Sequence, residues 1–279
     1  MTMRAHTRRI WNFLLLLLAL PVGLFAAEAQ NAFSEGVKYY QAGKYKEAVG
    51  AFNRALKAAP KSDEAYNNRG LAYFKLGQID NAIKDYDEAI KLNPKLTDAY
   101  FNLGNAHMAQ KQYERAVKDF DEVIKLDATA PRAHRQRGLA HISLKQFDKA
   151  IGDLSQAQKA DAKDVEIYYN RGLAYRRLGK NELAVQDYGE AIKLEPKNAE
   201  SYNNRANAYS LLGKYDEAVK DYDEALKLDA KNARIYANRG VIRSRQGKID
   251  DAQKDFKKAV DLDPSLKDKV ETLLAPNKR

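Results

Sequence analysis

The sequence predicts an all-α protein, an α-α superhelix built from seven helix-turn-helix repeats, and three observations carry this prediction. An alanine recurs every 34 residues without insertion or deletion, at Ala48, Ala82, Ala116, Ala150, Ala184, Ala218 and Ala252. Twelve positions before it stands another small residue, at Gly36, Gly70, Gly104, Gly138, Gly172, Ala206 and Gly240. Sixteen positions before six of these alanines stands a ring side chain, at Tyr66, Tyr100, His134, Tyr168, Tyr202 and Tyr236.

Each repeat reads as two amphipathic helices. In the second repeat, apolar or small residues recur at three- and four-residue steps, first from Tyr66 to Tyr73 and then from Ala82 to Ile90. A glycine separates the two helices in five repeats, at Gly43, Gly77, Gly179, Gly213 and Gly247. An acidic residue opens the second helix in six repeats, where it suits the positive helix end, at Asp80, Glu114, Asp148, Glu182, Asp216 and Asp250.

The repeats are expected to occupy residues 30–266 and to stack on one another. The small residues let helix axes approach to the close end of the ~8–10 Å range. One hairpin cannot bury its apolar stripe, so each repeat needs a neighbour. After the last repeat, residues 265–279 place Leu266, Val270, Leu273 and Leu274 on one helical face. This segment is predicted to be a C-terminal capping helix and tail.

The 34-residue pattern resembles the tetratricopeptide repeat, and the resemblance implies a docking platform for other proteins rather than an enzyme. In that family the first helix of each repeat lines a concave face. The sixth repeat position lies there and carries Ser34, Asn68, Asn102, Gln136, Asn170, Asn204 and Asn238. An asparagine amide can both donate to and accept from a peptide bond. The row resembles the asparagine ladder of O-linked N-acetylglucosamine transferases. The alternative is that asparagine is simply the family's common residue at this position.

Basic residues are expected to share the concave face, namely Arg132, Arg135, Arg176 and Arg177. They predict an acidic, extended protein or peptide segment as the ligand, although a solvated charged face is an alternative. The carboxylate clamp of chaperone adaptors is not matched, because Asn203 and Asn207 stand without the required lysine. The net charge of +10 favours acidic partners. It does not by itself indicate nucleic acid, and none is expected as a partner.

A second pattern predicts a structural ion pair. Five repeats have arginine directly before the small residue, at Arg69, Arg137, Arg171, Arg205 and Arg239. Each of these has an aspartate sixteen residues later, at Asp85, Asp153, Asp187, Asp221 and Asp255. The first repeat lacks both members, having Glu35 and Ala51. We therefore expect an arginine–aspartate contact between the two helices of a repeat. The alternative is a contact between repeats, with Asp119 serving Arg137.

Residues 1–29 have the three parts of a secretory signal peptide: basic Arg4, Arg8 and Arg9, an apolar run, and a small-residue site ending at Ala29. Cleavage after Ala29 would place the protein in the bacterial periplasm or outside the cell. The absence of cysteine excludes a lipid-anchored form and disulfides. The alternatives are an uncleaved membrane anchor over residues 10–27 and a twin-arginine signal.

No pattern of catalytic or metal-binding residues is recognisable. His6 falls in the signal peptide, while His107, His134 and His141 occupy positions that hold tyrosine in other repeats. No nucleophile elbow or phosphate-binding glycine loop occurs, so no enzyme activity, metal or cofactor is expected. The predicted function is a scaffold that binds an extended or helical protein segment in its concave groove. The alternatives are a membrane-anchored assembly factor and a regulatory subunit of a separately encoded enzyme.

Overall fold

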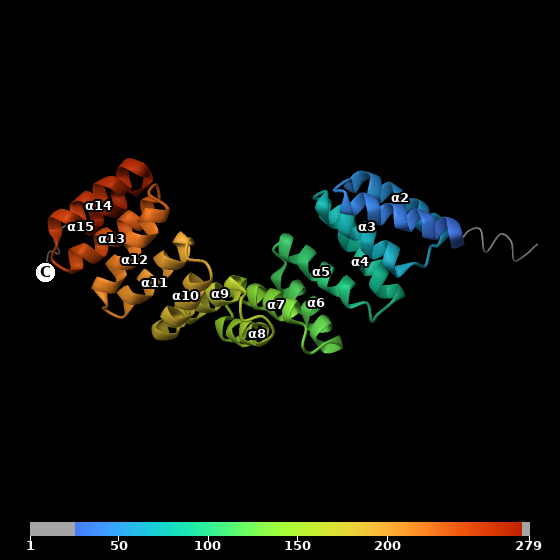
Figure 1. Ribbon diagram of the computed structural model, residues 1–279, viewed down its shortest axis with the longest axis horizontal. Coiled ribbons are helices and arrows are strands. Elements are labelled where there is room, and N and C mark those ends of the chain that lie inside the picture. Colours follow the sequence, from blue (N-terminus) through green and yellow to red (C-terminus); the bar gives the residue numbers. More distant parts are fainter. Residues whose placement is uncertain (1–25, 275–279) are drawn as a thin grey trace, which may run out of the picture. The chain divides into compact units, whose positions relative to one another are not determined.

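The computed structural model describes residues 26–274, and within that range every regular element is a helix (Figure 1). A helix at residues 26–41 comes first. The others are α2 (Tyr45–Ala58), α3 (Asp63–Lys75), α4 (Ile79–Leu92), α5 (Thr97–Ala109), α6 (Tyr113–Leu126), α7 (Pro131–Ser143), α8 (Phe147–Ala160), α9 (Val165–Arg177), α10 (Asn181–Leu194), α11 (Ala199–Leu211), α12 (Tyr215–Leu228), α13 (Ala233–Arg245), α14 (Ile249–Leu262), the 3-10 helix η1 (Pro264–Leu266) and α15 (Lys267–Leu274). They form seven consecutive pairs followed by a final helix, as the 34-residue period predicts.

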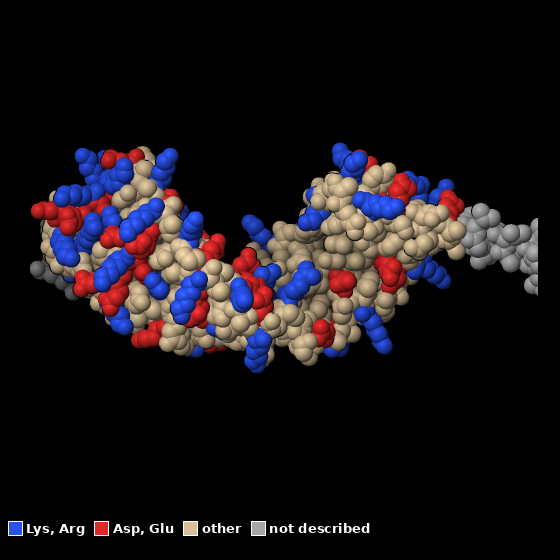
Figure 2. Space-filling model, in the orientation of Figure 1, with Lys and Arg blue, Asp and Glu red and all other residues tan. Residues whose placement is uncertain are grey.

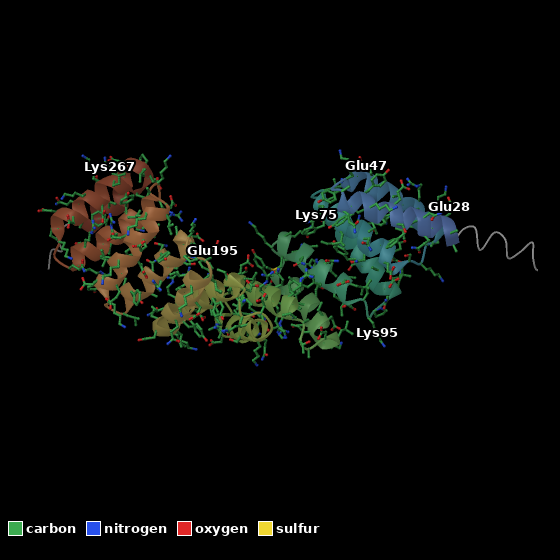
Figure 3. The ribbon with its side chains drawn as sticks, in the orientation of Figure 1. Glu28, Glu47, Lys75, Lys95, Glu195 and Lys267 are labelled. Carbon is green, nitrogen blue, oxygen red and sulfur yellow. The ribbon has the colours of Figure 1, made fainter. Side chains whose placement is uncertain are left out.

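The described helices group into two compact units, residues 26–133 and residues 134–274, with the division inside α7. In the first unit α3 packs on α2 and α4, α4 on α5, and α5 on α6. Its interior is a series of small cores, one per repeat, around the fully buried rings of Phe52, Tyr86 and Phe120. Charged side chains such as Glu47 and Lys75 point away from these cores into solvent (Figure 3).

Glycine is needed in the first helix because the aromatic ring of the second helix lies directly against it. A Cβ atom on Gly70 would lie 2.6 Å from the ring of Tyr86, and one on Gly104 would lie 2.6 Å from the ring of Phe120. Contacts this short do not occur between carbon atoms in well-packed interiors. The small residue and the aromatic, sixteen residues apart, therefore define one packing unit in six of the seven repeats, and in the fourth Leu154 takes the place of the aromatic.

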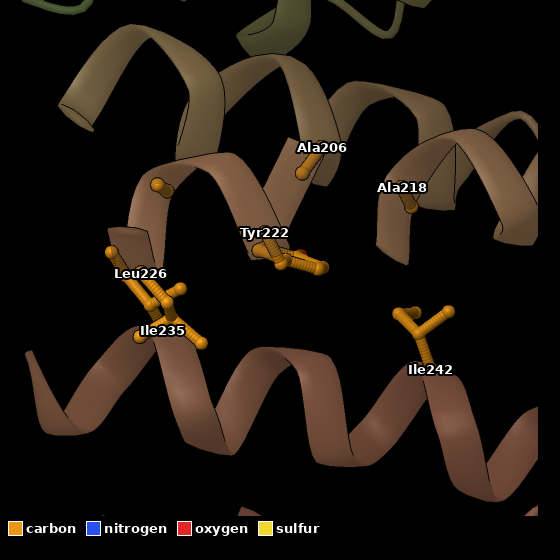
Figure 4. Packing of buried hydrophobic residues seen from close by; sticks show 7 residues of the cluster. Ala206, Ala218, Tyr222, Leu226, Ile235 and Ile242 are labelled. Carbon is orange, nitrogen blue, oxygen red and sulfur yellow. The ribbon is translucent and has the colours of Figure 1, made fainter. Parts of the chain in front are cut away.

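In the second unit the same core repeats along α9 to α14. Tyr222 of α12 packs with Ala206, Ala218 and Leu226, and Ile235 and Ile242 of α13 lie against this cluster (Figure 4). The last core is closed by α15, whose Val270 is 6% exposed and packs on Ala252 and Phe256. The predicted capping helix is therefore present. The side chains of Leu273 and Leu274 lie outside the described part of the chain.

The turn inside each repeat requires a left-handed backbone. Gly43, Gly77, Gly179, Gly213 and Gly247 have φ between +72° and +76°. In the third and fourth repeats the same position is Lys111 and Lys145, with φ of +60° and +59°. A residue with a Cβ atom pays roughly 1–2 kcal/mol for this conformation. The two middle repeats therefore have more strained turns than the other five.

The fourth repeat is expected to be the least stable, because α8 departs from the repeat pattern. It has Gly152 in mid-helix, Leu154 in place of the aromatic, and Gln158 in place of an aliphatic residue. Amide hydrogen exchange should be faster over residues 149–159 than over residues 214–227 of α12. Gly152 is exposed and a Cβ there meets nothing within 4 Å. Gly152→Ala should therefore raise the free energy of unfolding by about 0.5–1 kcal/mol. Equal protection of the two segments would contradict this expectation.

Candidate functional site

The predicted ligand-binding asparagines lie on the first helices of successive repeats, and these helices contact one another: α3 contacts α5, α9 contacts α11, and α11 contacts α13. Asn68, Asn102 and Arg132 belong to the first unit, and the other predicted site residues belong to the second. All six ladder residues are half-buried: Asn68, Asn102, Gln136, Asn170, Asn204 and Asn238. Each unit therefore has its own row of amide side chains, one per repeat.

The asparagine amides form hydrogen bonds within the protein. Asn102 Nδ2 donates to Asn67 Oδ1 at 2.9 Å, and Asn204 Nδ2 donates to the hydroxyl of Tyr169 at 2.9 Å. Both partners lie on the preceding first helix. Asn238 makes longer contacts, with 3.5 Å from its Nδ2 to Asn203 Oδ1. These bonds tie one repeat to the next.

The remaining two asparagines bond within their own helix. Asn68 Nδ2 donates to the Glu64 carbonyl and Asn170 Nδ2 to the Glu166 carbonyl, both at 2.8 Å. No residue in the described range donates to an Oδ1 atom of the five asparagines. An amide nitrogen carries two hydrogens, so each asparagine that donates once keeps one N–H and its oxygen. That is the pair of groups needed to hold a peptide bond.

The four predicted arginines differ in their surroundings. Arg135 is engaged with Asp164 at 2.8 Å and with Glu166 at 3.0 Å. Arg132 is exposed, and its guanidinium carbon lies 4.5 Å from the ring centroid of Phe101. Arg176 and Arg177 have no carboxylate within 4.0 Å among the described residues. Of the four, only Arg135 is paired with carboxylates in the described range, so the positive charge available to a ligand lies at Arg132 and at the end of α9.

The arginines that precede the small residue form ion pairs inside each repeat, as predicted. Arg171 Nε donates to Asp187 Oδ2 and its Nη2 donates to Asp187 Oδ1, both at 2.8 Å. Arg69, Arg137, Arg205 and Arg239 hold their aspartates through the same two nitrogens. The third nitrogen, Nη1, of Arg69, Arg171 and Arg239 contacts the preceding repeat, at Asn53, Ser155 and Asp223 respectively. These arginines are structural and leave no charge for a ligand.

In the third repeat a histidine takes the place of the arginine as the partner of the aspartate, and the sequence pattern did not predict this contact. Leu103 stands in the arginine position, and the aspartate of that repeat, Asp119, contacts Nδ1 of His107 at 2.6 Å. Burial raises the pKa of Asp119 while the bond to His107 opposes that shift. The available signal was the joint occurrence of Leu103 and His107 in one repeat. His107 is therefore not only a packing residue, as its position had indicated.

The three histidines of the described residues are all buried. His134 and His141 are buried beside Asp153, which is itself held by Arg137. No group of three or more His, Asp or Glu in the described range is placed to hold a metal ion. Positive and negative side chains are interspersed on the face that Figure 2 shows.

Among the described helices none is long and apolar enough to cross a membrane. The anchor considered for residues 10–27 lies almost entirely outside the described residues.

Comparison with known families assigns nearly all repeats. Models described as TPR repeat match residues 36–77, 70–111, 138–179 and 172–213. A model described as tetratricopeptide repeat matches residues 97–129, 199–232 and 233–266. A comparison with curated proteins finds no match.

Solved structures show the same fold. The C-terminal part of a TPR repeat-containing protein from Cytophaga hutchinsonii is 21% identical with a TM-score of 0.72, and the match covers 87% of this chain and 99% of that one. MamA is 26% identical with a TM-score of 0.59, covering 63% and 96%. YrrB, described as a TPR protein with an unusual peptide-binding site, is 19% identical with a TM-score of 0.60, covering 64% and 93%.

Proposed function

Because the chain belongs to the tetratricopeptide repeat family, we propose that it is a non-enzymatic scaffold that binds an extended segment of another protein along the first helices of its repeats. One observation carries the proposal: asparagines on successive first helices each keep an N–H and an oxygen after their bonds within the protein are counted. The peptide-binding site named for YrrB supports this choice of ligand.

The spacing of the amides suits an extended chain. First helices of neighbouring repeats lie about 10 Å apart when they pack closely, and an extended chain advances ~3.3 Å per residue. One asparagine would then meet every third residue of the ligand. Because the contact is to the peptide backbone, the ladder would hold many sequences alike. Side-chain contacts elsewhere on the first helices would select among them.

Replacing three ladder residues in the second unit should weaken peptide binding strongly. Each lost hydrogen bond is worth about 1 kcal/mol, so Asn170→Ala/Asn204→Ala/Asn238→Ala should lower affinity on the order of 100-fold. Suitable probes are peptides of about 12 residues, long enough to span four helices, selected on the unaltered protein from a random library. Affinity is measured by fluorescence anisotropy.

Two results distinguish the ladder from other modes. The loss should be similar for all selected peptides, because backbone contacts carry no sequence information. Asn81→Ala, on the exposed side of the second helix α4, is the matched control and should leave affinity unchanged. Unchanged binding by the triple variant would mean that ligands dock elsewhere, and the ladder proposal would fail.

We also propose that residues 1–29 are removed during secretion to the periplasm or the cell exterior. Residues 26–29 continue into the first helix, so cleavage after Ala29 would shorten that helix by four residues. The mature protein should begin at Gln30 and lack tryptophan, because Trp11 is the single tryptophan of the chain. Intact mass and tryptophan fluorescence of protein from the native envelope measure this. A retained leader would support the membrane-anchored alternative instead.

A further inference from the structure

The inner surface at the end of α9 contains polar groups that lack partners. The hydroxyl of Tyr188 and the Nε of Arg176 are both buried, and neither forms a hydrogen bond with a described residue. The side chain of Tyr188 is fully buried. Buried tyrosine hydroxyls nearly always have a hydrogen-bond partner. Two orphaned donors in one place therefore indicate that an acceptor is missing.

Both groups lie together on the side of α9 that carries the proposed ligand. Tyr169, Leu173 and Arg176 are spaced four and three residues apart, so they share one face of the helix. The ring of Tyr169 contacts the ring of Tyr188 with centroids 5.9 Å apart. Asn204, a ladder residue, donates to the hydroxyl of Tyr169. The orphaned groups are thus next to the amide row.

The charge of Arg176 is unusual for its position. The same repeat position is uncharged in every other repeat, with Tyr40, Phe74, Met108, Ile142, Ser210 and Ser244. Arg171 on the same helix is fully engaged by Asp187, whereas Arg176 and Arg177 have no carboxylate within 4.0 Å in the described range. Burial raises the pKa of Tyr188, and the charge and the side-chain N–H groups of Arg176 oppose that rise more than the charge of Arg177 does. The guanidinium of Arg176, itself buried at Nε, is therefore the nearer of the two charges to the hydroxyl.

The set offers more donors than acceptors. A guanidinium has five N–H donors and no acceptor, and a tyrosine hydroxyl that accepts from a guanidinium still has its own O–H to donate. Tyr222, the equivalent residue of the next repeat, is different because its hydroxyl already donates to Asn207 at 2.8 Å. A carboxylate has two oxygens and the complementary charge, and its hydrogen bonds to a guanidinium are charge-assisted.

We propose that Arg176, Arg177 and the hydroxyl of Tyr188 form a carboxylate subsite, which binds one aspartate or glutamate side chain of the protein segment held by the ladder. The subsite rests on the proposed function, since the ladder would bring the ligand to it. The subsite would make binding depend on the sequence of the ligand, because the ladder alone contacts only the ligand backbone. The preferred ligand has an acidic residue at the point where it crosses α9.

The test compares two peptides that differ in one residue. A peptide selected on the unaltered protein is synthesised with glutamate or glutamine at its acidic position. The glutamate form should bind about 10- to 100-fold more tightly, as expected for charge-assisted hydrogen bonds. Arg176→Gln should abolish that preference, chiefly by lowering the affinity for the glutamate form to that of the glutamine form. Added salt should weaken only the preference for glutamate.

A tyrosine pair supplies the matched control. Tyr188→Phe removes a hydroxyl that lacks a partner, so it should reduce the glutamate preference several-fold without lowering the thermal midpoint. Tyr222→Phe removes a satisfied hydroxyl and should lower the midpoint while leaving the preference intact. Equal binding of both peptide forms, or a preference that survives Arg176→Gln, would overturn the subsite while the ladder stands. If ladder replacements also leave binding unchanged, the proposed function falls as well.

Discussion

Replacing Asp187 with alanine is expected to lower the free energy of unfolding by about 3–5 kcal/mol, because a charged arginine would be left unpaired in the interior. Arg171 is 9% exposed and Asp187 is 5% exposed. The bond to Asp187 raises the pKa of Arg171, so the guanidinium remains protonated. Ser155 and Gln158 contact its Nη1 but carry no charge to balance it. Urea denaturation monitored by circular dichroism measures the loss.

Two further variants test whether burial is the cause. Glu35→Ala breaks the Arg54–Glu35 pair, whose side chains are 54% and 45% exposed, and should cost at most about 1 kcal/mol. The double variant Arg171→Leu/Asp187→Ala removes both charges, with leucine as at Leu103. It should be more stable than Asp187→Ala alone. A single variant that loses less than about 1 kcal/mol would show that the pair is not structurally important.

Phe120→Ala is expected to cost about 3–5 kcal/mol, the range for truncating a buried aromatic. Phe120 is fully buried, it lies against Gly104, and its ring centroid is 5.7 Å from that of Phe101. Alanine would leave a cavity that the backbone at Gly104 cannot fill. The control Leu211→Ala removes a side chain that is 60% exposed and should change stability by less than about 0.5 kcal/mol.

The loss at Phe120 should also be local, since each repeat packs only on its neighbours. Hydrogen exchange should accelerate over α5 and α6, while α13 and α14 keep their protection. Uniform acceleration along the whole chain would mean that the repeats unfold as one cooperative unit, and the nearest-neighbour description would be wrong for this protein.

The sequence predicted the helices well because every repeat solves the same packing problem. The spacing of Gly70 from Tyr86 and of Arg171 from Asp187 recurs often enough to be recognised without coordinates. The capping helix followed from the apolar face that includes Val270. These features depend on periodicity, which a single chain with seven copies reveals directly.

What could not be predicted depends on one-off contacts between side chains. The bond from Asn204 to Tyr169 requires a tyrosine that its neighbours lack. The left-handed conformation of Lys111 occurs where other repeats supply glycine. The hydroxyl of Tyr222 donates to Asn207, whereas the repeat of Tyr188 has Leu173 at the equivalent position and its hydroxyl has no partner among the described residues. Each of these contacts occurs in a single repeat, so a prediction based on residues shared by all repeats does not include it.

The bidentate ion pair between arginine and aspartate affects which changes in repeat number this protein can tolerate during evolution. Both partners lie inside one 34-residue period, sixteen residues apart. Duplication or loss of a whole period therefore adds or removes balanced charge and leaves no buried ion stranded. The remaining guanidinium nitrogen, Nη1, contacts residues of the preceding repeat as different as Asn53, Ser155 and Asp223. It can therefore accept a different preceding repeat. An insertion or deletion of any other length between the two partners would separate them, so rearrangements by whole periods are the ones that a descendant chain would retain.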